Sequence, residues 1–177
     1  MRKIVLTFGL IAGAVLSVMM FLTIPFMDQL GDHGLLIGYT TMVLAFLMVY
    51  FGIRSYRDNV NGGQVTFGRA FKVGVLISLV ASTCYVASWE FIYHNITPDF
   101  VENYATSTLA KARKSGATDA QIEQKKKEMA EFAEQYKNPL INIAYTYLEP
   151  LPVALLFTLV SAGMLSRKRH ADGPVAA

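Results

Sequence analysis

Cysteine, charged residues and catalytic motifs are all scarce in this sequence of 177 residues. The single cysteine, Cys84, excludes an internal disulfide and a zinc cluster built from cysteines. Charged residues make up 16% of the chain, against about 25% in an average soluble domain. No HExxH, GxSxG or paired-cysteine motif occurs. We therefore expect a protein that is not an enzyme, that holds no metal or cofactor, and that is not an ordinary soluble domain.

Hydrophobic residues, by contrast, are abundant at 53%, and they gather in four long blocks at about 4–27, 34–53, 73–93 and 140–165. A membrane-spanning helix needs about 20 mostly apolar residues, because the hydrocarbon core is about 30 Å thick and each helical residue rises about 1.5 Å. The first block also resembles a signal peptide, but its apolar run continues well past the cleavage-like Ala12-Gly13-Ala14, which favours an uncleaved span. The prediction is an all-α polytopic membrane protein with four transmembrane helices, forming one membrane domain over residues 1–177.

Basic residues indicate how these spans are oriented. They gather at the N-terminus, in the loop after the second span and in the C-terminal tail: Arg2, Lys3, Arg54, Arg57, Arg69, Lys72, Arg167, Lys168 and Arg169. The loop between the first two spans has no Lys or Arg, so the positive-inside rule predicts cytoplasmic N and C termini. Basic residues dispersed at membrane ends favour contact with lipid headgroups and argue against a nucleic-acid partner.

The long polar segment 95–138 is predicted to form an extracytoplasmic helical hairpin between helices 3 and 4. Thr97 is a suitable N-cap with Pro98 at the first helical position, and Ser115-Gly116 is a suitable stop. Thr118 and Gln121 match a capping box that begins the second helix. The apolar stripes of both helices are modest, so two alternatives stay open: a spacer between spans, or a docking surface for a partner.

Small residues recur every four positions in the first three blocks, which is the spacing that lets membrane helices approach closely. The candidate helix-packing residues are Gly9, Gly13, Gly34, Gly38, Gly74, Ser78 and Ser82. Packing within one chain is the simpler explanation, and a homo-oligomer formed through one of these faces is the alternative.

Glu149 is the first candidate for an ion or proton site. It lies inside the fourth block and is followed at once by Pro150 and Pro152, which lack the N–H that a continuous helix needs. A carboxyl beside a broken helix resembles the ion and proton sites of transporters. The alternative is that the span begins nearer Ala144, so that Glu149 lies at the headgroups and Pro150 simply begins the deeper helix.

Glu90 and His94 are the second candidate, because their spacing of four residues places them on one helix face. With Glu149, Asp28, Asp32 or His33 they would form an outward-facing metal or proton site. A metal site needs three or four ligands, however, and the alternative is a snorkelling acid beside an interfacial histidine. We therefore assign no metal.

Several short motifs together resemble a family of small bacterial inner-membrane proteins known only as a domain of unknown function. They are the Gly62-Gly63 turn, the Phe67-Gly68-Arg69-Ala70-Phe71-Lys72-Val73-Gly74 entry to the third span, and Pro98-Asp99-Phe100. The resemblance implies a four-helix protein of a bacterial cytoplasmic membrane. It implies no activity, so it assigns no functional residue.

The sequence therefore favours a non-enzymatic integral membrane protein that acts through helix association or partner docking. The partners expected are the lipid bilayer and either a second copy of the chain or another membrane protein. The alternative function is a small ion- or proton-coupled transporter that uses Glu149 as its intramembrane carboxylate.

Overall fold

The computed structural model describes residues 1–26, 30 and 33–166, and all regular structure in these residues is helical. In chain order the elements are α1 (Arg2–Thr23), η1 (Ile24–Phe26), α3 (His33–Asn59), α4 (Phe67–Asn95), α5 (Phe100–Lys114), α6 (Asp119–Tyr136), α7 (Pro139–Leu148) and α8 (Leu151–Leu165). The predicted all-α class is confirmed. Asp28, Asp32 and the basic residues 167–169 lie outside the described residues.

Three of the described helical segments are long and apolar enough to cross a membrane: Arg2–Phe26, His33–Asn59 and Phe67–Asn95. Apart from Met27, which lies outside the described residues, they contain the first three predicted blocks. The fourth block is divided between α7 and α8, which pass the same test only as a pair and meet at a bend of 41°. The described residues therefore hold three candidate membrane-spanning helices, or four if the bent pair is one span.

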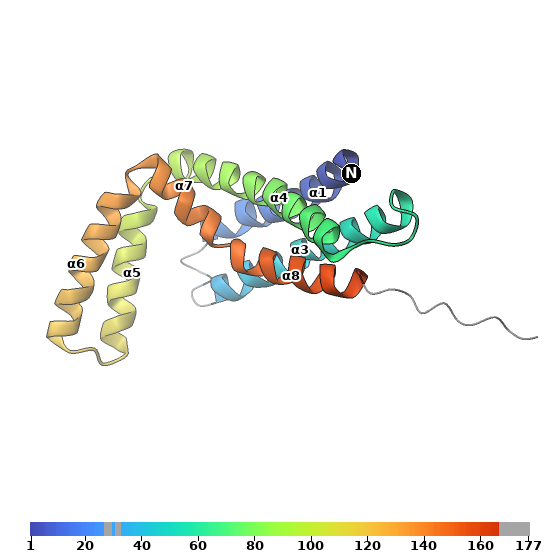
Figure 1. The fold of residues 1–177 in the computed structure, drawn as a ribbon. Helices are drawn as coiled ribbons and strands as arrows, with labels where there is room; N and C mark the ends of the chain where they lie inside the picture. The colour runs from blue at the N-terminus through green and yellow to red at the C-terminus, as the bar shows by residue number, and fades with distance from the viewer. Residues whose placement is uncertain (27–29, 31–32, 167–177) are drawn as a thin grey trace, which may run out of the picture.

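The long helices pack so that α1 and α8 each contact both α3 and α4. Figure 1 shows α1 and α8 on either side of this pair. The centre is filled by fully buried aliphatic and aromatic side chains, among them Phe46 and Ile53 of α3 and Val73 and Ile77 of α4.

Polar and apolar residues are distributed as expected for a protein surrounded by lipid. Ser78, Ser82, Thr158 and Ser161 are buried between the helices. The outer surface instead carries large apolar side chains, which include Leu10, Leu22, Leu36, Leu44, Leu156 and Met164. In water such a surface would be a severe aggregation hazard, whereas in a bilayer it is the favourable one. The structure thus fits a membrane protein.

The hairpin is present, with α5 and α6 side by side and crosswise to α8 (Figure 1). Gly116 has a φ of +79°, which lets the chain leave α5, and the Thr118–Gln121 capping box begins α6 as predicted. The predicted start of the first hairpin helix at Thr97 and Pro98 is wrong, since α5 begins at Phe100. The Thr97 N–H continues the end of α4 by donating to the Ile92 carbonyl, and the Phe100 N–H donates to the Thr97 carbonyl, which makes a turn there.

Candidate functional site

The break between α7 and α8 is the feature that positions Glu149. Asn138 caps α7 through its side chain, which accepts from the Leu140 N–H at 3.0 Å. α7 ends at Leu148 with Glu149 as its C-cap, and α8 begins after Pro150, whose carbonyl accepts from the Ala154 N–H at 2.9 Å. Pro150 and Pro152 cannot donate to the preceding turn, so the helix bends here.

Glu149 is held by a residue far away in the sequence. The Tyr85 hydroxyl of α4 donates to Glu149 Oε2 at 2.6 Å, a short charge-assisted hydrogen bond. The Glu149 side chain is otherwise exposed on the surface of the helices. The 15 residues of α8 place Glu149 about 22 Å from the far end of that helix. If α7 and α8 cross a bilayer, a carboxyl inside it has to be protonated, paired or covered, because a bare charge at the centre of a spanning helix costs about 2.5–3.5 kcal/mol.

Part of α3 is left uncovered by the other helices. Gly38 is on the same face of α3 as Gly34, Thr41 and Ala45, which are buried, yet Gly38 is exposed. A Cβ at Gly38 would meet no atom within 4 Å. The reason is that α8 packs on α3, whereas α7 bends away and packs on α4 and α6.

Tyr39, the residue after Gly38, lies within electrostatic range of Tyr85, which also donates a hydrogen bond to Glu149. We call the set formed by Gly38, Tyr39, Tyr85 and Glu149 the open face. It brings together one candidate packing residue and one candidate ion-binding residue, which the sequence had suggested for separate purposes.

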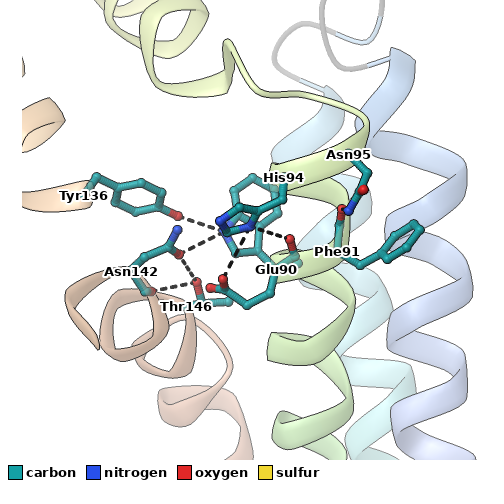
Figure 2. Close-up of polar contacts among 8 residues, drawn as sticks. Glu90, Phe91, His94, Asn95, Tyr136, Asn142 and Thr146 are labelled. Carbon is teal, nitrogen blue, oxygen red and sulfur yellow. Dashed lines mark hydrogen bonds and ion pairs between the residues drawn. The ribbon is translucent and has the colours of Figure 1, made fainter. Parts of the chain in front are cut away.

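A buried polar network holds α7 and the hairpin onto α4. The Trp89 Nε1–H donates to the Tyr136 hydroxyl at 2.9 Å and to Asn142 Oδ1 at 3.2 Å. The Thr146 hydroxyl in turn donates to the Asn142 carbonyl at 2.9 Å (Figure 2). Burial raises the pKa of the Tyr136 phenol to about 12, so this group stays neutral at physiological pH. Asn142 and Thr146 are not among the candidate site residues, and the available signal was a polar pair four residues apart within an apolar block.

The Glu90 and His94 pair forms as predicted from its spacing, but it stays within α4. His94 Nδ1 lies 3.7 Å from Glu90 Oε2 and 2.9 Å from the Glu90 carbonyl oxygen (Figure 2). Glu90 Oε1 is buried without a hydrogen-bond partner in the described part of the chain. No described contact joins this pair to Glu149, and no group of three or more His, Cys, Asp or Glu side chains suited to a metal forms among the described residues. A shared site for Glu90, His94 and Glu149 stays a prediction.

Most of the predicted small residues serve contacts within the chain. A Cβ at Gly9 would lie 2.6 Å from Val80 Cβ, and one at Gly13 would lie 2.6 Å from Cys84 Cβ, so α1 and α4 touch at these glycines. Gly74 likewise faces Thr158 of α8, whose hydroxyl is 3.4 Å from that of Ser78. Ser82 and Gly34 are buried as well.

Gly38 opens on empty space, unlike Gly9, Gly13 and Gly74. Gly52, which the small-residue spacing did not identify, is also a contact position, since a Cβ there would meet Ile77 and Phe8.

Comparison with known proteins supplies a family and no activity. The family described as "Protein of unknown function (DUF4199)" matches residues 7–167, which is nearly the whole chain. No curated protein and no solved structure matches the chain. This agrees with the resemblance drawn from the sequence motifs, and the chain belongs to this family of unknown function.

Proposed function

We propose that the chain spans the membrane four times, with α7 and α8 forming one broken span and both termini in the cytoplasm of a bacterial cell. Support comes from the length of α8, whose 15 residues cover about 22 Å and fall short of a bilayer core of about 30 Å unless α7 is added. The clustering of basic residues around Arg2, Arg54 and Arg69 supports the orientation.

Reporter fusions at the two termini test this arrangement. Both should report the cytoplasm, and a fusion in the turn at Gly116 should report the opposite side. Two termini reporting different compartments would refute the four-span arrangement.

Within that arrangement, we propose that the protein works by association, and that the open face takes a transmembrane helix of another chain. The observation that supports this proposal best is that Gly38 and Glu149 are both exposed. A glycine facing empty space lets a second helix approach closely, and van der Waals packing is what drives association in lipid. A partner helix over Glu149 would also shield the carboxyl from lipid, whereas without a partner the carboxyl stays exposed to lipid.

The test is a pull-down from membranes after treatment with a membrane-permeant crosslinker. Two differently tagged copies of the full chain are coexpressed, and either copy is captured. Recovery of the second tag supports a homo-oligomer, and recovery of one other membrane protein in constant proportion supports a hetero-complex. Recovery of neither would count decisively against association.

A small proton-coupled transporter is the second candidate, because Glu149 lies at a helix break and accepts a hydrogen bond from Tyr85. One carboxyl and one hydroxyl suit a proton better than a metal ion, which takes more ligands. Neither candidate involves catalysis, since both use Glu149 as a binding group.

A further inference from the structure

The α5–α6 hairpin has segregated charges. Its distal half, next to the Gly116 turn, carries six basic and two acidic side chains, a net charge of +4: Lys111, Arg113, Lys114, Lys125, Lys126 and Lys127 with Asp119 and Glu123. The half next to α4 and α7 carries five acidic side chains and one basic, a net charge of −4: Asp99, Glu102, Glu128, Glu131, Glu134 and Lys137. The net charges of the two halves cancel, so the net charge of the whole hairpin is zero although its tip is strongly basic.

A surface hollow of about 960 Å³ shows which way part of this tip faces. It is lined by Leu35 of α3 and, on the hairpin, by Ser115 and three charged residues, Lys111, Lys125 and Glu128. Leu35 lies in the first turn of a helix long enough to span the membrane, so it marks the membrane boundary. The hairpin side that carries Lys111 and Lys125 is therefore turned toward the membrane end of α3.

The direction of the hairpin agrees with this placement. In Figure 1, α5 and α6 run crosswise to α8, to one side of the packed long helices. If those helices cross a bilayer, the hairpin extends along the headgroup layer and its tip lies over lipid. Lysine binds phosphate as a mobile point charge, and basic residues are attracted to a surface rich in anionic lipid.

We propose that the tip of the hairpin docks on anionic phospholipid headgroups of the adjacent leaflet, with one headgroup phosphate seated in the hollow beside Leu35, Lys111 and Lys125. The acidic half of the hairpin lies next to the protein, and of its carboxylates Glu128 lines the hollow, opposite in charge to Lys111 and Lys125. This inference rests on the proposed membrane arrangement and is independent of what binds at the open face.

The experiment places a fluorophore at the tip of the full-length protein. Cys84→Ser removes the natural thiol and Ser115→Cys supplies the labelling site at the rim of the hollow. The labelled protein is reconstituted in nanodiscs of phosphatidylcholine, with or without phosphatidylglycerol, and quenching by a nitroxide attached to a lipid headgroup is measured. We expect roughly twofold or stronger quenching with phosphatidylglycerol, lost at about 1 M salt where the screening length falls to about 3 Å.

Matched triple variants identify the responsible charges. Lys125→Gln, Lys126→Gln and Lys127→Gln together should abolish the response to phosphatidylglycerol, and the three Lys→Arg changes should preserve it. Glu128→Gln, Glu131→Gln and Glu134→Gln neutralise as many charges on the same helix and should leave the response intact or stronger. Far-UV circular dichroism checks that α6 still forms in each variant.

Three results would overturn the proposal. Equal quenching in neutral and anionic nanodiscs would show that the tip does not dock on anionic lipid. An equal loss in the lysine and glutamate variants would show that the effect is structural. Quenching that rises when inorganic phosphate is added to neutral nanodiscs would assign the hollow to free phosphate. None of these readouts requires a partner helix or a proton flux, so failure here is distinguishable from failure of the proposed function.

Discussion

Leucine in place of Gly38 should abolish the crosslinked assembly and leave the protein folded. The position opens on empty space, so the chain itself accommodates the new side chain, and exchanging glycine for leucine in a helix gains about 0.8–1 kcal/mol of propensity. A partner helix packed against Gly38 would instead be pushed away by four added carbon atoms. The measurement is the fraction of chains recovered in crosslinked form, together with the free energy of unfolding in mixed detergent micelles.

Two further glycines provide the controls. Gly163 of α8 also has no atom within 4 Å of a Cβ position but is not part of the open face, so Gly163→Leu should keep the assembly. Gly13 is packed against Cys84 Cβ, so Gly13→Leu should destabilise the fold by about 3 kcal/mol or more. If the assembly survives Gly38→Leu, the open face is not the site of association. The same conclusion follows if Gly163→Leu disrupts the assembly as much as Gly38→Leu does.

The helices could be predicted from the sequence because their signals are local. An uncharged block such as residues 34–53 has one stable state in lipid, and the Thr118–Gln121 capping box involves a span of only four residues. The start of α5 was predicted wrongly because Thr97 and Pro98 satisfy the local rules for a helix start, whereas the backbone bonds at Ile92 and Phe100 make a turn.

The site could be predicted only in part, because its contacts are long-range. Glu149 was identified from the two prolines that follow it within three residues, but Tyr85, its hydrogen-bond partner, is 64 residues away in the sequence. The small-residue spacing identified Gly13 and Gly38 equally, although one is buried against α4 and the other is open. That difference arises from the bend of α7 away from α3, which no pattern within α3 encodes.

Glu149→Leu should weaken association roughly tenfold, and Glu149→Gln should leave it within about twofold of the wild type. Polar contacts between membrane helices contribute about 0.6–1.7 kcal/mol, and about 1.4 kcal/mol corresponds to a factor of ten. Glutamine keeps an oxygen that accepts from the Tyr85 hydroxyl and an amide that bonds to a partner, whereas leucine keeps neither. The measurement is the dimer or complex fraction against protein concentration in bilayers.

The same two variants separate association from proton transport, because the two functions use different properties of one carboxyl. A transporter needs a group that binds and releases a proton, so Glu149→Gln would reduce the flux of wild-type proteoliposomes to that of empty liposomes. Glu90→Gln is the matched control, since Glu90 pairs with His94 and has no described contact with Glu149. A proton flux that the wild type shows, that Glu149→Gln loses and that Glu90→Gln keeps would establish transport. If Glu149→Leu associates as strongly as the wild type, the carboxyl has no binding role at the open face. Association weakened by Glu149→Leu alone, with no wild-type flux, is the outcome we expect, because an exposed carboxyl is what a covering helix would stabilise.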